Sequence, residues 1–172
     1  VLASVPSLRV VARVGVGYDA VDVPAATARN IAVTITPGTN EHSVAEQAIS
    51  LITGIYRGFP FRDQTVRRGQ WIRQSLPRLA GKTLGLVGLG RIGKAIVPRA
   101  QGLGLKVVAY DPFPNHDFAA ANNVWICSFD ELLAEADIVS LHLPATAETR
   151  DLINAASLAK MNHAAKAREI VG

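Results

Sequence analysis

The feature that most constrains this chain is a glycine triplet directly after a short apolar run. Gly88, Gly90 and Gly93 have the spacing G-x-G-x-x-G and follow residues 84–87, which read Leu-Gly-Leu-Val. The triplet alone is a weak signal, because chance places it in roughly one chain in twenty of this length. Its position between an apolar strand and the start of a helix is far more specific. The pattern predicts a strand–turn–helix unit that binds a dinucleotide.

Each glycine of the triplet has its own physical reason. Gly88 permits the tight turn out of the strand, Gly90 leaves room for a diphosphate, and Gly93 lets helix and strand pack closely. The free N–H groups of Arg91 and Ile92 at the helix start would bind the diphosphate, supported by the helix dipole. The alternative is a purely structural glycine turn in an α/β fold that binds no nucleotide.

A carboxylate completes the dinucleotide pattern. Asp111 follows the apolar run 106–110 and lies 18 positions after Gly93 (111 − 93), close to the offset of about twenty expected for the ribose-binding residue. A 2′-phosphate about 4 Å from this carboxylate would be repelled by about 4 kcal/mol, or about 2 kcal/mol after a discount for solvent. No arginine follows Asp111 to offset that repulsion. The sequence therefore predicts NAD rather than NADP as the cofactor.

From residue 81 onward, short apolar strands alternate with helices. The predicted strands are 84–87, 106–110, 124–126 and 137–143, and the predicted helices are 91–103 and 129–136. Strands that are apolar throughout indicate a parallel sheet covered on both faces. We therefore expect residues 81–172 to form a Rossmann-type doubly wound α/β domain, incomplete at its C-terminus. Pro98 lies inside the first helix, where it removes a hydrogen bond and predicts a kink.

Residues 1–38 contain a smaller α/β fragment. Strands are expected at 8–14 and 31–35, with a short helix at 24–29 between them. This fragment is too small to hold a hydrophobic core of its own, so we interpret it as the C-terminal part of a larger α/β domain.

Residues 39–80 are expected to connect the two domains. Ser43 and Glu46 have the S-x-x-E spacing of a capping box, and apolar residues follow at helical spacing as far as Phe59. The stretch 58–79 is rich in arginine and interrupted by proline and glycine, so it is interpreted as a linker or arm. We expect an interdomain helix followed by an arm.

Composition narrows the possible functions. The chain is 49% hydrophobic and carries a net charge of +4, and no apolar run approaches the roughly 18–20 residues of a membrane span. The single cysteine, Cys127, favours a reducing compartment, so we expect a cytoplasmic protein without disulfides. No metal site is expected. An arginine cluster lacks the interleaved aromatic residues of a nucleic-acid surface, and a solvated, oligomer-facing or anion-attracting surface is the preferred interpretation. The cluster consists of Arg57, Arg62, Arg67, Arg68, Arg73 and Arg78.

Several segments, in order, make the chain similar to the D-isomer-specific 2-hydroxyacid dehydrogenases. They are RVGVGYDAVD, TPGTNEHSVAEQ, RRGQW, GKTLGLVGLGRIGKAI, VVAYDP and FDELLAEADIVSLHLPATAETRDLIN, and they cover the chain to about Met161. The resemblance implies an NAD-dependent oxidoreductase that interconverts a small D-2-hydroxy acid and its 2-oxo acid. It also implies that residues 1–38 belong to a flavodoxin-like substrate domain, and that residues 39–80 form the dimerisation arm of a homodimer.

The resemblance also assigns roles to single residues. The backbone N–H groups of Val16 and Gly17 would hold the substrate carboxylate, and Val16 would lie near the nicotinamide. Leu143 and Pro144 would belong to the loop that covers the cofactor. His142 precedes them at a position that the family uses structurally, so we do not expect it to be the catalytic acid.

The catalytic arginine of the family corresponds to Arg168, which would clamp the substrate's carboxylate and carbonyl. In the family, a strand and a glycine flank this arginine, and a glutamate and a histidine complete the set further downstream. Here a short run before Arg168 is missing and the other two residues would lie beyond Gly172. The printed chain is therefore expected to lack turnover on its own. Two other interpretations stay open: a dinucleotide-sensing binding protein of the C-terminal-binding corepressor type, and an inactive NAD-binding fragment.

Overall fold

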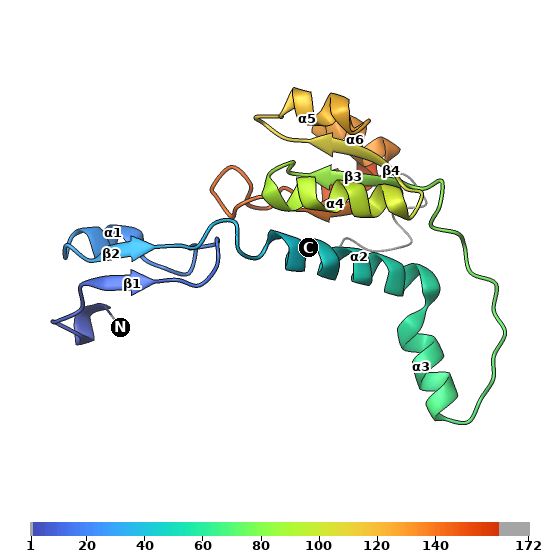
Figure 1. Cartoon of the computed structure of the whole chain (residues 1–172), viewed down its shortest axis with the longest axis horizontal. Helices are drawn as coiled ribbons and strands as arrows, with labels where there is room; N and C mark the ends of the chain where they lie inside the picture. Colours follow the sequence, from blue (N-terminus) through green and yellow to red (C-terminus); the bar gives the residue numbers. More distant parts are fainter. Residues whose placement is uncertain (1, 162–172) are drawn as a thin grey trace. The chain divides into compact units, whose positions relative to one another are not determined.

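The computed structural model describes residues 2–161 (Figure 1). The chain divides into two compact units, Val1–Glu41 and His42–Gly172, and each is described by itself. Among the described residues, no helix is both long and apolar enough to cross a lipid bilayer.

The first unit is a small parallel strand pair with one helix. β1 (Val10–Ala12) pairs with β2 (Ala32–Thr34), with Val10 opposite Ala32. α1 (Val23–Thr27) connects them and starts at Asp22, whose side chain accepts a hydrogen bond from the Ala25 N–H. Both strands are shorter than predicted, because the observed ladder joins only three residues on each side, and the helix ends two residues earlier than predicted.

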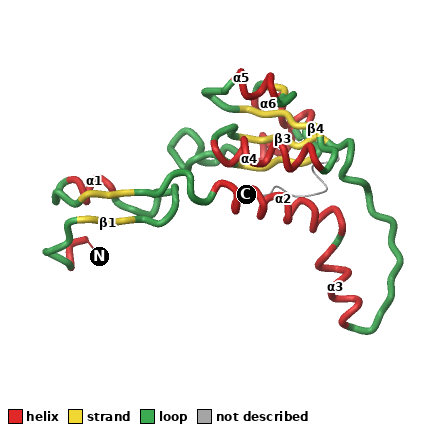
Figure 2. The backbone as a smooth tube through the Cα atoms, in the orientation of Figure 1, coloured by secondary structure: helices red, strands yellow, loops and turns green. Residues whose placement is uncertain are grey.

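The second unit is built on a four-stranded parallel sheet in the order β5-β4-β3-β6. Figure 2 distinguishes the strands and helices of the chain by colour. Its strands are β3 (Thr83–Val87), β4 (Lys106–Tyr110), β5 (Trp125–Ile126) and β6 (Ile138–Leu141). Along the chain, β3 is the first strand of this sheet. β4 and β5 follow on one side of it, and β6 is then added on its other side. The predicted parallel α/β fold is confirmed, and β3 lies where the strand order reverses.

Helices connect and cover these strands. α4 (Arg91–Gly102) joins β3 to β4, α5 (His116–Ala121) joins β4 to β5, and α6 (Phe129–Glu135) joins β5 to β6. α2 (Glu41–Arg57) precedes the sheet and α7 (Ala155–Lys160) follows it. The helices fall into two groups because crossovers between parallel strands must leave the sheet on one face or the other.

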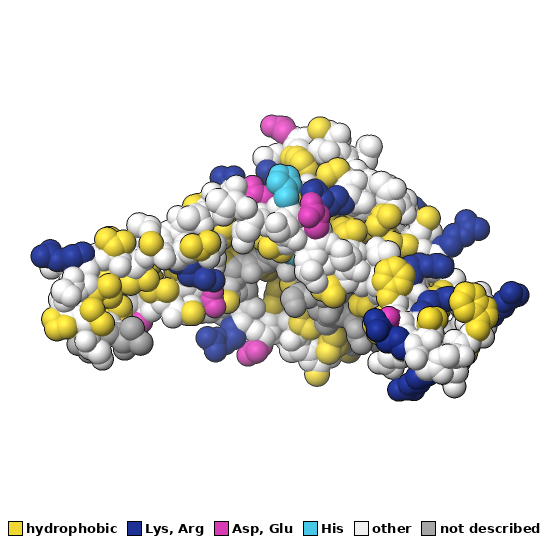
Figure 3. All heavy atoms as spheres, turned by 60° about the horizontal axis from the view of Figure 1, so that its bottom comes forward, with side chains coloured by type: hydrophobic (Ala, Val, Ile, Leu, Met, Phe, Trp, Pro, Cys, Tyr) yellow, Lys and Arg dark blue, Asp and Glu magenta, His cyan; other side chains and the backbone are white. Residues whose placement is uncertain are grey.

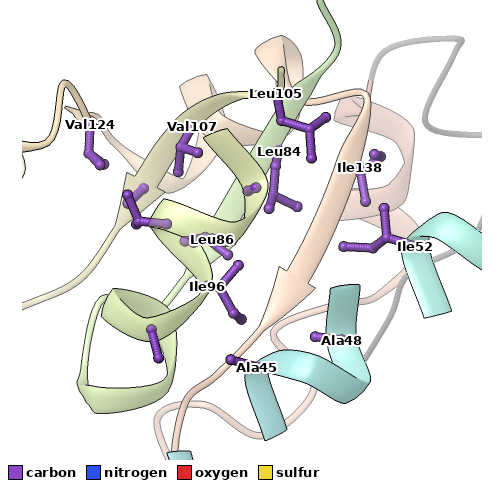
Figure 4. Close-up of a cluster of buried hydrophobic side chains, with 14 of the residues drawn as sticks. Ala45, Ala48, Ile52, Leu84, Leu86, Ile96, Leu105, Val107, Val124 and Ile138 are labelled. Carbon is purple, nitrogen blue, oxygen red and sulfur yellow. The ribbon is translucent and has the colours of Figure 1, made fainter. Parts of the chain in front are cut away.

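The strands bury side chains on both faces. Leu84 and Leu86 belong to a cluster with α2 and α4, in which Ile52 and Ile96 lie over the sheet (Figure 4). Val87 belongs to the opposite cluster, built around α6. Successive residues of a strand point to opposite faces, so β3 alternates between the two clusters.

Gly85 sets the distance between β3 and α6. A Cβ at this position would lie 2.7 Å from Leu132 Cδ2 and 2.9 Å from Ala136 Cβ. α6 can therefore pack on the sheet only because residue 85 has no side chain.

The predicted capping box at Ser43 is wrong. α2 begins at Glu41, so Ser43 lies within its first turn and not before it. A capping box does occur at α6, where the Ser128 hydroxyl accepts from the Glu131 N–H and the Glu131 carboxylate accepts from the Ser128 N–H at 2.8 Å.

α3 (Phe59–Arg67) occupies the first half of the stretch 58–79, for which no helix was predicted. Pro60 lies in the first turn of α3, where its missing N–H would have had no intrahelical partner. α5 and α7 were not predicted either. In α4 the helix continues through Pro98 as far as Gly102, with the proline ring exposed to solvent.

Candidate functional site

The turn after β3 is closed around two glycines. Gly88 has a φ of +104°, and a Cβ there would lie 2.5 Å from the carbonyl oxygen of His142. A Cβ on Gly93 would lie 2.3 Å from the Gly88 carbonyl oxygen. Neither position accepts a side chain without moving backbone, so these two glycines fix how β3, α4 and the end of β6 meet.

The third glycine faces open space. A Cβ on Gly90 would have no atom within 4 Å, although Gly90 is the residue that caps α4. No side chain caps this helix, and the N–H groups of Gly90, Arg91 and Ile92 have no hydrogen-bond partner among residues 2–161. Unpaired N–H groups at the positive end of a twelve-residue helix form a ready site for an anion such as a diphosphate.

Asp111 lies beside this turn, directly after β4. Its Oδ2 accepts a hydrogen bond from the Leu89 N–H at 2.7 Å, and its Oδ1 accepts from the Phe113 N–H at 2.8 Å. These bonds fix the carboxylate against the glycine turn. Each carboxylate oxygen has a second acceptor position, so Asp111 can still accept hydrogen bonds from ribose hydroxyls.

The end of β6 forms the other side of the turn. The His142 N–H donates to the Val87 carbonyl at 2.8 Å, which extends the β3–β6 ladder by one residue. Leu143 Cδ2 would lie 3.1 Å from a Cβ on Gly88, and the Pro144 carbonyl accepts from Thr149 Oγ1 at 2.6 Å. The structure therefore places Leu143 against the glycine turn and Pro144 directly after it.

His142 is a neutral, structurally bonded side chain. Its Nε2 lies 2.8 Å from the hydroxyl of Ser140, and burial lowers the pKa of His142 to about 4. Ser140 is completely buried and was absent from the sequence prediction. The signal that could have identified it is a serine in an otherwise apolar strand, two positions before a histidine and so on the same strand face.

The turn after β1 belongs to the first unit. Gly15 donates its N–H to Thr36 Oγ1 at 2.8 Å and accepts from the Thr36 N–H at 3.0 Å, while Arg13 Nε donates to the Gly17 carbonyl. The N–H groups of Val16 and Gly17 make no hydrogen bond within the described chain. They are free to bind an acceptor such as a carboxylate.

Arg168 and Cys127 are the remaining residues to consider. Arg168 lies outside the described residues. Burial, and then the charges of Glu131 and Glu135, raise the pKa of the Cys127 thiol, so it is not an activated nucleophile. Within residues 2–161, no group of three or more His, Cys, Asp or Glu side chains is arranged to hold a metal ion.

Two surface hollows lie away from the glycine turn. One, of about 380 Å³, is lined by side chains of α3 and of the segment after it, including Trp71, Arg62 and Arg73. The other, of about 350 Å³, lies between α2 and α3. Basic and apolar side chains gather around this part of the surface at the right of Figure 3. These hollows do not include any residue of the dinucleotide pattern.

The site as a whole fits a dinucleotide. Free helix N–H groups can hold its diphosphate, the open space at Gly90 can admit it, and Asp111 can hold the adenosine ribose. This arrangement can bind and orient such a ligand.

Comparisons with known proteins point the same way. Residues 49–166 match the sequence model described as "D-isomer specific 2-hydroxyacid dehydrogenase, NAD binding domain". The chain is 47% identical over 162 residues to D-3-phosphoglycerate dehydrogenase of Mycobacterium tuberculosis, covering 93% of this chain and 31% of that protein. It is 39% identical over 171 residues to glyoxylate reductase of Korarchaeum cryptofilum, covering 96% and 52%. The chain thus spans about a third to a half of the length of these relatives.

Solved structures give the same result. The structure of D-lactate dehydrogenase from Aquifex aeolicus, complexed with NAD and lactic acid, superposes with a TM-score of 0.84 and 30% sequence identity. The match covers 94% of this chain and 49% of that one.

Proposed function

Because the chain belongs to the D-isomer-specific 2-hydroxyacid dehydrogenase family, we propose that the whole protein interconverts a small D-2-hydroxy acid and its 2-oxo acid with NAD. The family, the parallel α/β fold and NAD as cofactor of the matched domain agree with the predictions from sequence. The observation that carries the proposal is the pairing of a free helix N-terminus with the fixed carboxylate of Asp111.

When bound, NAD supplies the site with a nicotinamide that accepts or donates a hydride. The residues of this chain bind and orient that ligand. The N–H groups of Arg91 and Ile92, at the open space left by Gly90, hold the diphosphate, while Asp111 accepts the ribose hydroxyls. Leu143 and Pro144 provide the apolar wall beyond the glycine turn.

Three residues are assigned to substrate binding in this proposal. The unpaired N–H groups of Val16 and Gly17 support a role in binding a carboxylate, and we assign Arg168 to clamping the same substrate. In this proposal, residues 1–38 are the C-terminal part of the substrate domain and residues 81–172 the NAD-binding domain. The single cysteine, Cys127, supports a reducing compartment such as the cytoplasm.

Residues 39–80 would then be the interdomain helix and dimerisation arm. Large apolar side chains are exposed on α2, α3 and the segment after them, which is typical of a surface that another protein covers. They are Leu51, Phe59, Phe61, Val66, Trp71 and Ile72. We propose a homodimer through this surface, and light scattering that gives a monomer mass for the full-length protein at micromolar concentration would contradict it.

Cofactor choice tests the function at its central residue. In the full-length protein, calorimetry should show NAD binding at least tenfold more tightly than NADP, because Asp111 repels a 2′-phosphate by about 2 kcal/mol. Asp111→Ala should narrow this ratio mainly by weakening NAD. Asp63→Ala, which removes an exposed carboxylate paired with Arg67, is the matched control and should leave the ratio unchanged.

Turnover tests the reaction. When the full-length protein is supplied with NADH and with phosphohydroxypyruvate, glyoxylate or pyruvate, the absorbance of NADH should fall. The 2-oxo acid that is reduced fastest identifies the substrate. Tight NAD binding without turnover of any 2-oxo acid would favour the dinucleotide-sensing alternative. Equal affinities for NAD and NADP would contradict the role assigned to Asp111.

A further inference from the structure

β6 contains a buried polar pair that the proposed function does not use. Ser140 is completely buried between apolar neighbours, and its hydroxyl lies 2.8 Å from Nε2 of the half-buried His142. Burying polar groups costs free energy unless they are paired, and two apolar side chains would stabilise this strand at least as well. A buried polar pair at the end of β6, beside the turn that follows β3, therefore points to a role beyond packing.

The hydrogen bond determines which imidazole nitrogen carries the proton. Within residues 2–161, His142 Nε2 is the only hydrogen-bond partner of Ser140 Oγ. A completely buried hydroxyl needs an acceptor for its proton, so Ser140 donates and Nε2 accepts. Burial holds the pKa of His142 near 4, so the ring is neutral at pH 7. A neutral ring whose Nε2 accepts must carry its proton on Nδ1.

This Nδ1–H is free to act as a donor. It has no hydrogen-bond partner among the described residues. The Nδ1 atom is not fully buried, so solvent reaches it. The backbone carbonyl of the same residue lies against Gly88, which places His142 directly beside the glycine turn.

The strand order shows which part of a dinucleotide would meet it. Asp111 follows β4 on one side of β3, whereas His142 follows β6 on the other side. A dinucleotide with its adenosine ribose at Asp111 and its diphosphate at α4 crosses β3, so its nicotinamide half extends toward β6. That half carries ribose and diphosphate oxygens that accept hydrogen bonds.

We propose that Ser140 fixes the tautomer of His142 so that its Nδ1–H donates a hydrogen bond to an oxygen on the nicotinamide half of NAD. His142 is then a cofactor-binding residue and Ser140 a positioning residue that acts through it. This inference rests on the proposed function, because it requires NAD to lie across the glycine turn.

Binding measurements on the full-length protein test the contact. His142→Ala should weaken NAD and ADP-ribose about five- to tenfold, as expected for one lost hydrogen bond, and should leave the affinity for AMP unchanged within twofold. His142→Asn should recover most of this loss, because its amide nitrogen lies about where Nδ1 was. His42→Ala, an exposed histidine on α2, is the matched control and should change no affinity.

Nitrogen NMR of the histidine ring tests the tautomer without relying on a variant that folds. The wild-type protein should show a protonated Nδ1 and an unprotonated Nε2 at pH 7, and Ser140→Ala should lose this preference and bind NAD more weakly. A protonated Nε2 in the wild type would overturn the inference, as would equal losses for NAD and AMP in His142→Ala. If the wild type binds NAD and His142→Ala binds it equally well, this inference fails while the proposed function stands. A wild type that does not bind NAD would contradict both.

Discussion

The two compact units use short parallel strands with very different degrees of burial. In the first unit, Val10 of β1 is 50% exposed and Val14 after it is 88% exposed. In the second unit, Leu84 and Leu86 of β3 are completely buried. The pairing pattern is parallel in both, so the difference comes from what covers the sheet. Strand pairing satisfies the backbone, but helices on both faces are needed to remove apolar side chains from water.

The same contrast applies to the functional turns. The glycine turn of the second unit is held by backbone of β3, α4 and β6, together with the carboxylate of Asp111. The turn with Val16 and Gly17 is held by the reciprocal hydrogen bonds between Gly15 and Thr36. We therefore expect the cofactor site to be rigid on its own core, and the proposed substrate turn to depend on fewer contacts.

The largest expected difference between the units is the free-energy cost of truncating a side chain. Leu132→Ala removes a completely buried side chain that packs against Gly85, and it should cost about 3–4 kcal/mol in the second unit. Val10→Ala should cost less than about 1 kcal/mol in the first, because half of that side chain is already in water. Hydrogen exchange of β1 and β3 amides with increasing denaturant measures each unit separately. Equal costs would show that β1 is covered in solution.

The second unit was also the more predictable from sequence. β4 was predicted at its observed bounds, and β3 and α4 to within one residue, because each signal is local. Strands that are buried on both faces are continuous apolar runs, which are easily recognised. The glycine spacing is set by backbone geometry within six residues. Asp111 was identified for the same reason, since the strand–helix–strand unit fixes its distance along the chain.

The features that the sequence did not predict are of two kinds. Some depend on contacts between residues distant in the chain, and one depends on a glycine and a proline that begin a helix. Pro60 was interpreted as a break in the arginine-rich stretch, yet it lies in the first turn of α3, and Gly58 just before this helix adopts a left-handed φ of +59°. The six-residue helices α5 and α7 are too short for a periodic pattern. Ser140 was missed because its partner is recognised only when the strand brings both side chains to one face.

The next largest expected difference between the units is the pH dependence of their free energy of unfolding. His142 has a folded pKa of about 4, below its ordinary value of 6.5, so the unfolded chain binds its proton first. Stability from this group is therefore complete above pH 6.5 and is lost as the pH falls toward 4, by about 2 kcal/mol after a discount for partial exposure. Residues 1–41 contain no histidine, so β1 and β2 should show no such loss. The measurement is the exchange-derived stability of β3 at several pH values, and His142→Asn should remove this part of the slope.

The smallest expected effect compares the caps of two short helices. Ser128 caps α6 in the second unit, and Asp22 caps α1 in the first. Replacing either residue by alanine should cost about 1 kcal/mol locally, since each leaves one backbone N–H without its acceptor. The loss of stability should extend beyond α6 but stay within α1, because α6 buries Leu132 and Leu133 against the sheet whereas α1 buries only Ala26.

Ser128→Ala should therefore lower the exchange-derived stability of β3, while Asp22→Ala should speed exchange only within α1.

The pKa of Glu131 is a second measurement, which reports on the Ser128 cap itself. Hydrogen bonds from the side chain and then the backbone of Ser128 lower the pKa of Glu131, so this stabilisation is present above the ordinary carboxyl pKa and is lost as the pH falls. In Ser128→Ala the pKa of Glu131 should rise toward its ordinary value, and an NMR titration measures it. Ser128→Thr keeps the hydroxyl and should preserve both readouts. If Asp22→Ala instead lowered protection throughout β1 and β2, the first unit would be as cooperative as the second, and the contrast between them would not hold.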